Sequence, residues 1–145
     1  METRVNIQAK EPAAFKAMFG LEGYIHTTKI PALQLHLIKI RASQINGCAF
    51  CIDMHTKEAL KDGETQQRIF LLNAWNETSL YTPEEKVLLA ITEEVTLIHK
   101  DGLTNETYKA ALALFDENYI AQVIMAVVAI NGWNRIAIST HLEVQ

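Results

Sequence analysis

The sequence predicts an all-α protein, and three observations favour this fold class. Apolar residues recur at spacings of three and four over most of the chain, which is the period of helices that bury one face. No run alternates apolar and polar residues for long enough to indicate a β-strand. Asn-Gly and Asp-Gly steps separate the periodic segments and suit tight connections between helices. With 145 residues the chain can bury one sizeable core, so we expect a single domain over residues 1–145 with six or seven helices.

Prolines and glycines place the helices of the first half of the chain. Pro12 and Pro31 each suit the first turn of a helix, where no backbone N–H is needed. Gly47, after Asn46, suits the left-handed residue that ends one helix, and Gly63 ends the next. The predicted helices cover residues 13–24, 31–44, 48–61 and 64–75, and residues 1–10 are expected to be extended.

Capping residues place the helices of the second half. Thr82, Pro83 and Glu85 form a helix start with a capping box. Thr104 and Asp116 suit the N-cap positions of two further helices. The predicted helices cover residues 83–99, 104–115 and 116–139. The last one is apolar on most of its surface, so we expect subunit association to cover part of it.

Composition and charge exclude several functional classes. Apolar residues make up 49% of the chain, charged residues 21%, and the net charge is −4, without a Lys/Arg cluster longer than a pair. Binding to nucleic acid or to an anionic membrane is therefore not expected. The N-terminal residues lack the apolar run of a signal peptide, and the apolar stretch at 119–130 is shorter than a bilayer span. We expect a cytoplasmic protein, in which a close cysteine pair favours redox chemistry or metal binding over a permanent disulfide.

The two cysteines of the chain define the candidate site. Cys48, Cys51 and His55 stand at i, i+3 and i+7, which places them on one face of the predicted helix. A helix N-terminus lowers the pKa of a thiol, and His55 is near enough to Cys51 to take its proton. One thiolate can then attack a peroxide and become a sulfenic acid, which the other cysteine converts to a disulfide. The spacing therefore favours a redox-active dithiol.

Other interpretations of the cysteine pair remain open at this point. The two cysteines could be small buried side chains without chemistry. A structural zinc site needs four ligands, so His36 or His99 would have to join the three residues above. A permanent disulfide is disfavoured by the expected compartment. We expect neither a metal nor another cofactor.

The motif resembles a known family. The stretch K-I-R-A-S-Q-I-N-G-C-A-F-C-I-D-M-H at 39–55, followed by G-E-T-Q-Q-R-I at 63–69, resembles the alkylhydroperoxidase D-like (AhpD-like) group of the carboxymuconolactone decarboxylase family. The segment at 129–138 is similar to the closing helix of that group. The resemblance implies an all-α fold that assembles into trimers or hexamers and reduces peroxides. It implies that Cys51 is the attacking thiol, that Cys48 resolves it, and that His55 belongs to a proton relay.

Two positions depart from the family's pattern. The family places a relay glutamate twelve residues before the first cysteine, where this chain has His36. Its best-characterised peroxidases have a histidine between the cysteines, where this chain has Phe50. A histidine titrates near neutral pH, so His36 could accept a proton, although it cannot act as a permanent anion. The alternative is a histidine without a role.

The sequence thus predicts a cytosolic, homo-oligomeric thiol peroxidase whose Cys48–Cys51 disulfide is reopened by a separate dithiol reductant, lipoamide-like or thioredoxin-like. The first rival is a redox-sensing or partner-binding protein with little peroxidase turnover. The second is an oxidoreductase that acts on protein disulfides. Lys39 and Arg41 are expected to be solvated or in subunit contacts, and Trp133 to be in the core or in an interface.

Overall fold

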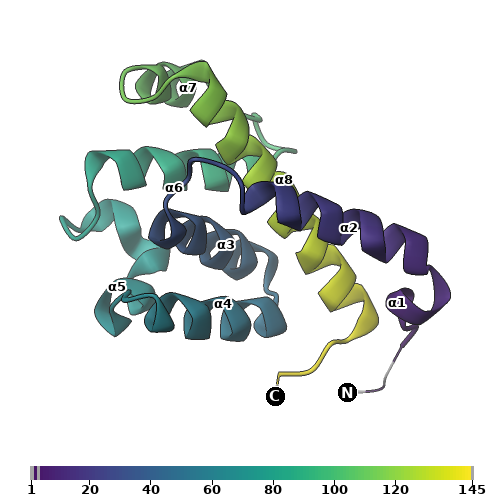
Figure 1. The fold of residues 1–145 in the computed structure, drawn as a ribbon. Coiled ribbons are helices and arrows are strands. Elements are labelled where there is room, and N and C mark those ends of the chain that lie inside the picture. The colour runs from purple at the N-terminus through teal and green to yellow at the C-terminus, as the bar shows by residue number, and fades with distance from the viewer. Residues whose placement is uncertain (1, 3, 145) are drawn as a thin grey trace.

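The computed structural model describes residues 2 and 4–144, and all of its regular structure is helical (Figure 1). Within these residues there are eight α-helices and one short 3-10 helix, and no strand. Their bounds are α1 Ile7–Lys10, α2 Pro12–Ile25, α3 Ala32–Asn46, α4 Ala49–Lys61, α5 Gln66–Phe70, η1 Leu72–Glu77, α6 Pro83–Thr96, α7 Asn105–Leu112 and α8 Glu117–Thr140. The all-α prediction is confirmed.

The local signals in the sequence begin and end the helices as predicted. The Thr82 side chain accepts from Glu85 N while Glu85 accepts from Thr82 N, which completes the capping box of α6. Thr104 and Asp116 cap α7 and α8 with their side-chain oxygens. Gly47 follows α3 with φ 71°, a left-handed conformation that only glycine adopts without strain.

Three predictions about the elements were wrong. The described part of the chain has more helices than six or seven, because residues 7–10 form the short helix α1 under an Asn6 cap. The single helix predicted at 64–75 is divided into α5 and η1, since tertiary contacts bury Leu72 and bond the Trp75 indole to Glu93 on α6 at 2.6 Å. The helix α6 ends at Thr96 and not at residue 99, and Ile98 beyond its end is 60% exposed.

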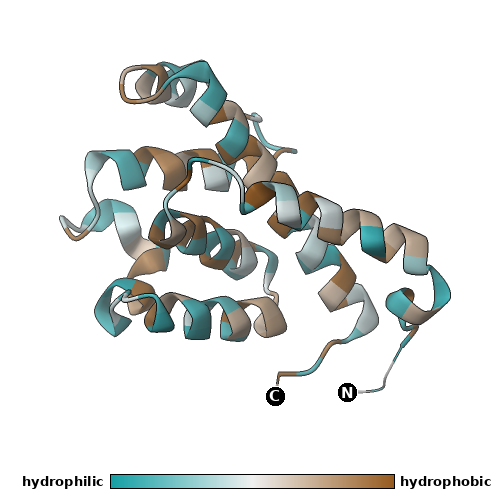
Figure 2. Ribbon diagram, viewed as in Figure 1, coloured by the Kyte–Doolittle hydropathy of each residue, from teal (hydrophilic) through white to brown (hydrophobic). Residues whose placement is uncertain are grey.

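The helix α8 runs through the middle of the molecule, with α2, α3 and α6 packed against it (Figure 1). Figure 2 shows strongly apolar residues where α8 passes beside α2 and α6. By length and composition alone α8 could cross a membrane, at 24 residues with a mean hydropathy of 1.3. Its side chains Val123, Ala126 and Val127 are fully buried against the other helices. The apolar character of α8 is therefore that of a core helix.

The turn between α3 and α4 is tied to α8. The Asn46 side chain donates to Asn131 at 3.0 Å and to Asn134 at 2.8 Å, both on α8. Asn134 is fully buried and donates in turn to the Ser43 hydroxyl. Because buried amides are costly unless paired, this network holds the turn in one place. Cys48 follows the turn directly, so its position is set by both helices.

Candidate active site

Cys48 and Cys51 form a disulfide at the N-terminus of α4, with 5.3 Å between their Cα atoms. The structure corrects one expectation, because Cys48 is the N-cap of α4, with an extended backbone, and the helix itself begins at Ala49. The Cys48 sulfur accepts a hydrogen bond from Cys51 N at 3.3 Å. An N-cap sulfur near unpaired N–H groups suits a thiolate, because the positive end of the helix dipole stabilises the charge. The two residues are 1% and 2% exposed.

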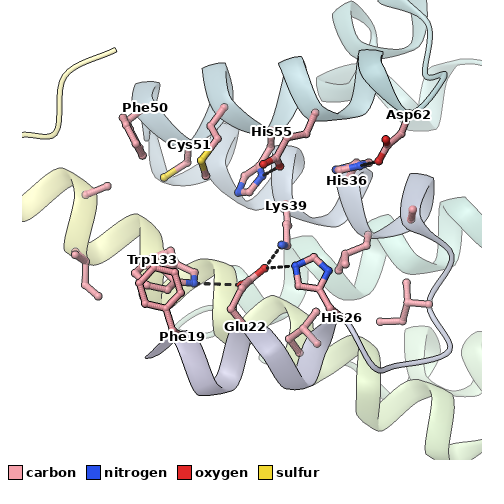
Figure 3. Close-up of a pocket in the computed structure, with 18 of the residues that line it drawn as sticks. Phe19, Glu22, His26, His36, Lys39, Phe50, Cys51, His55, Asp62 and Trp133 are labelled. Carbon is pink, nitrogen blue, oxygen red and sulfur yellow. Dashed lines mark hydrogen bonds and ion pairs between the residues drawn. The ribbon is translucent and has the colours of Figure 1, made fainter. Parts of the chain in front are cut away.

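A pocket of about 710 Å³ lies between α2, α3, α4 and the end of α8, and Cys51 is the cysteine that lines it. Apolar side chains make up much of the lining of this pocket (Phe15, Phe19, Phe50, Trp133, Ile136 and Leu142). The Trp133 ring lies 5.5 Å from that of Phe15 and 5.3 Å from that of Phe19, measured between centroids. Figure 3 shows Trp133 and Phe19 facing Cys51 from the opposite side. Trp133, expected in the core or in an interface, is therefore part of the pocket.

His55 lies one turn after Cys51 and is 5% exposed. Its Nδ1 is 2.8 Å from a carboxylate oxygen of Glu58. Since the carboxylate can only accept, Nδ1 carries the proton and Nε2 keeps its lone pair. Burial lowers the pKa of His55, and the hydrogen bond with Glu58 opposes only part of this effect. The ring is therefore neutral at pH 7 and able to take a proton.

His36 lines the same pocket as Cys51 and His55. Its Nε2 is 2.7 Å from a carboxylate oxygen of Asp62. Its Nδ1 is buried without a partner in the part of the chain that the structure describes. No hydrogen bond joins His36 to Cys51 or His55 within those residues. Its part in a proton relay stays a prediction.

A charged cluster across the pocket from Cys51 was missed from the sequence. Lys39 is 5% exposed and forms an ion pair with Glu22 on α2. The Glu22 carboxylate also accepts from the Trp133 indole at 3.2 Å and lies 3.3 Å from Nε2 of His26. Burial acts to raise the pKa of Glu22, but the hydrogen bond and charge of Lys39 outweigh it and hold that pKa below its usual range. The expectation that Lys39 is solvated was wrong.

A sequence signal for this cluster does exist. Glu22 follows Phe15 and Phe19 at helical spacing, so it shares their face of α2. A lone carboxylate on an otherwise apolar face indicates a buried partner or a site. Arg41, by contrast, lies away from this pocket and pairs with Glu93 on α6 at 2.8 Å.

Metal binding was one of the alternatives for the cysteines and histidines. Across the described ranges 2 and 4–144, no three or more His, Cys, Asp and Glu side chains are grouped so that they could hold a metal ion.

The profile of the carboxymuconolactone decarboxylase family matches residues 12–94, which include both cysteines and the pocket helices α2, α3 and α4. The chain belongs to this family. The uncharacterized protein YdfG of Bacillus subtilis (strain 168) is 44% identical to it over 139 residues, which is 96% of this chain and 95% of YdfG.

Solved structures share the whole fold. One is a protein of unknown function from Agrobacterium tumefaciens, proposed to be the antioxidant defence protein AhpD. It is 40% identical, with a TM-score of 0.95 over 99% of both chains. Together with the family match, this shows that the chain is AhpD-like. A debrominase is 18% identical, with a TM-score of 0.84 over 95% of this chain and 74% of its own. The debrominase shows only that the same helical fold occurs in a protein with other chemistry.

Proposed function

We propose that this AhpD-like protein is a thiol-dependent peroxidase that reduces peroxides through a Cys48–Cys51 dithiol/disulfide cycle. The observation that carries the proposal is the placement of Cys51. It lies in the first turn of α4 and lines the pocket, one turn before a neutral, carboxylate-bound His55. A thiolate at that position combines activation by the helix N-terminus with a nearby proton acceptor.

In the proposed cycle, Cys51 attacks first because its sulfur faces the pocket. His55 accepts the proton of the Cys51 thiol at Nε2, with Glu58 holding the ring in place. The thiolate attacks the outer peroxide oxygen, the O–O bond breaks, and Cys51 becomes a sulfenic acid. His36, with its own carboxylate partner and a free Nδ1, is proposed as a second proton acceptor in the same pocket.

Cys48 completes the cycle as the resolving thiol. Its sulfur lies beside Cys51 at the N-cap and outside the pocket lining. Condensation of the Cys48 thiol with the sulfenic acid forms the disulfide and releases water. No flavin, haem or metal takes part in these steps.

A separate dithiol reductant is proposed to reopen the disulfide. Burial of both sulfurs bears on which partners can reach them. A large protein disulfide cannot approach cysteines that are 1% and 2% exposed without movement of the chain. This disfavours the disulfide oxidoreductase rival and favours reductants whose thiol can enter the pocket.

We further propose that the protein acts in the cytoplasm as a homo-oligomer, a trimer or a hexamer. The helix α8 keeps apolar side chains at the surface, among them Val128 at 45% and Ile138 at 42% exposure. Contact between copies would remove such side chains from water. Light scattering of the purified protein measures the oligomeric state directly.

The cycle is tested by the intact mass of fully reduced protein after one equivalent of tert-butyl hydroperoxide. Wild type is expected to lose two hydrogens rapidly, and Cys48→Ser is expected to gain one oxygen at Cys51. Cys51→Ser is expected to gain no oxygen and lose no hydrogens on the same timescale. Reduced wild type that stays unchanged while a small disulfide oxidises it would contradict the peroxidase and favour the redox-sensing rival.

A further inference from the structure

The proposed reaction needs a donor for the leaving oxygen of the peroxide. Attack by the Cys51 thiolate breaks the O–O bond in line, so the leaving oxygen points away from the sulfur and into the pocket. It leaves as an alkoxide, a strong base that a pocket with an apolar wall stabilises poorly. His55 stands on α4, the same helix as the attacking sulfur, whereas the leaving oxygen is directed toward the opposite wall.

Lys39 and Glu22 stand on that opposite side. Figure 3 shows Cys51 and His55 along α4, Glu22 across the pocket on α2, and the Lys39 ammonium between them. All four side chains line the same pocket. Burial lowers the pKa of His55 most, and among the smaller effects the charge of Lys39 lowers it further while that of Glu22 raises it. A buried cation therefore faces the space into which the leaving oxygen moves.

The Lys39 ammonium also has N–H donors that Glu22 does not use. An ammonium carries three N–H donors, and in the described part of the chain the bonds found for Lys39 Nζ go to Glu22 alone. Glu22 is held in turn by the indole of Trp133 on α8 and by His26 at the end of α2. A purely structural ion pair gains nothing by leaving donors of a buried ammonium open toward a pocket.

We propose that Lys39 is the acid that protonates the leaving alkoxide, with Glu22 as the residue that positions its ammonium. This role rests on the peroxidase function proposed above. As the Cys51 sulfur takes the outer oxygen, the inner oxygen receives a proton from Lys39 and departs as the alcohol. The proton that His55 took from the Cys51 thiol restores the Lys39 ammonium, so that peroxide and two thiols give alcohol, water and disulfide.

The Lys39 ammonium is held on the side away from α4. The Glu22 carboxylate that pairs with it also lies 3.3 Å from Nε2 of His26, whose ring is 65% exposed. These contacts fix Glu22, and with it the position of the Lys39 ammonium in the pocket.

The test compares two oxidants that differ in their leaving group. tert-Butyl hydroperoxide releases an alkoxide that needs a proton, whereas peracetic acid releases acetate, which is stable as an anion. Rapid-quench mass spectrometry of the reduced protein gives the rate of Cys51 oxidation by each. Lys39→Met is expected to slow the hydroperoxide reaction about 100-fold and the peracid reaction by no more than about threefold. Glu22→Gln is expected to change the ratio of the two rates in the same direction by a smaller factor.

The ratio of the two rates corrects for any fraction of misfolded protein, because both oxidants report on the same sample. Lys57→Met, on the exposed side of α4, is the matched control and should leave the ratio unchanged. If Lys39→Met slows Cys51 oxidation by both oxidants equally, Lys39 is structural or acts on the thiol. Its role as the acid is then overturned, while the proposed peroxidase function stands. If wild type reduces neither oxidant, the peroxidase itself is overturned, and the role of Lys39 with it.

Discussion

Two clusters of charged side chains in this protein look alike in composition but differ in how completely they are bonded. In the first, Arg68 of α5 uses all five of its N–H donors on Glu64, Glu85 and the Leu80 carbonyl, at 2.6–3.2 Å. Its guanidinium also lies 4.8 Å from the centroid of the Tyr81 ring. In the second, Lys39 bonds to Glu22 and keeps donors open toward the pocket.

The difference separates a structural cluster from one suited to chemistry. The hydrogen bonds and charges of Glu85 and Glu64 outweigh burial and raise the pKa of Arg68. The guanidinium is therefore permanently charged, and all of its donors are in use. Glu85 also accepts from Thr82 N in the capping box, so Arg68 links α5 to the start of α6. A saturated cluster can only hold the fold, whereas an unsaturated one can still bind a group that enters the pocket.

The largest effect is expected at the saturated cluster. Arg68→Met leaves the carboxylates of Glu64 and Glu85 without their shared cation, with side chains that are 3% and 10% exposed. Removal of one partner from such a cluster costs about 3–5 kcal/mol of the free energy of unfolding. Urea unfolding measures the loss, and the oxidation rate of the protein that remains folded should not change.

The matched control is Lys57→Met, which removes the cation of an exposed pair with Asp53 on α4. Exposed pairs at this spacing contribute about 0.3–0.5 kcal/mol. A comparable loss in both variants would mean that the Arg68 cluster is no more important to the fold than a surface pair.

A large effect on rate with little on stability is expected at the pocket. His55→Gln keeps a hydrogen-bonding side chain beside Glu58 but removes the proposed proton acceptor of Cys51. We expect Cys51 oxidation by tert-butyl hydroperoxide to slow about 100-fold to 1000-fold, in the range of general acid–base catalysis. Stopped-flow oxidation of the reduced protein measures the rate.

The pH profile tests the same assignment. Because burial lowers the pKa of His55 below 6.5, the ring stays neutral, and active as a base, as the pH falls through 6.5. The wild-type rate should therefore decline only at a lower pH, when His55 becomes protonated. Glu58→Gln removes the partner that raises this pKa, so the decline should move to still lower pH. A decline centred at or above 6.5 would assign the base to another group.

The smallest effect is expected at the second histidine of the pocket. His36→Gln should slow Cys51 oxidation about tenfold, equivalent to about 1.4 kcal/mol in the barrier, because the proposed acceptor His55, one turn after Cys51 on the same helix, remains. The same stopped-flow assay measures it, with His55→Gln in parallel. An unchanged rate would leave His36 as no more than the partner of Asp62, at 2.7 Å.

Local chemistry explains why much of the fold could be predicted from the sequence. A capping box at Thr82, side-chain caps at Thr104 and Asp116, and a left-handed Gly47 depend on residues within one turn of one another. The motif from Cys48 to His55 is equally local, so its place at the start of α4 was predicted to within one residue.

Contacts between distant segments decided the rest. The division of the predicted 64–75 helix into α5 and η1 follows from the bond between Trp75 and Glu93 and from the burial of Leu72, which a helical pattern does not reveal. The pairing of Lys39 with Glu22 joins residues 17 positions apart on different helices.

The sequence by itself determined most of the helices, the family and the place of the cysteine pair at the start of α4, because each depends on residues close together in the chain. Only the tertiary structure decided which charged groups face the sulfur. Helices α2, α3 and α8 bring Glu22, Lys39 and Trp133 together across the pocket from Cys51. A charge withdrawn from water must find its partners in space, and separation along the chain does not determine which ones it finds.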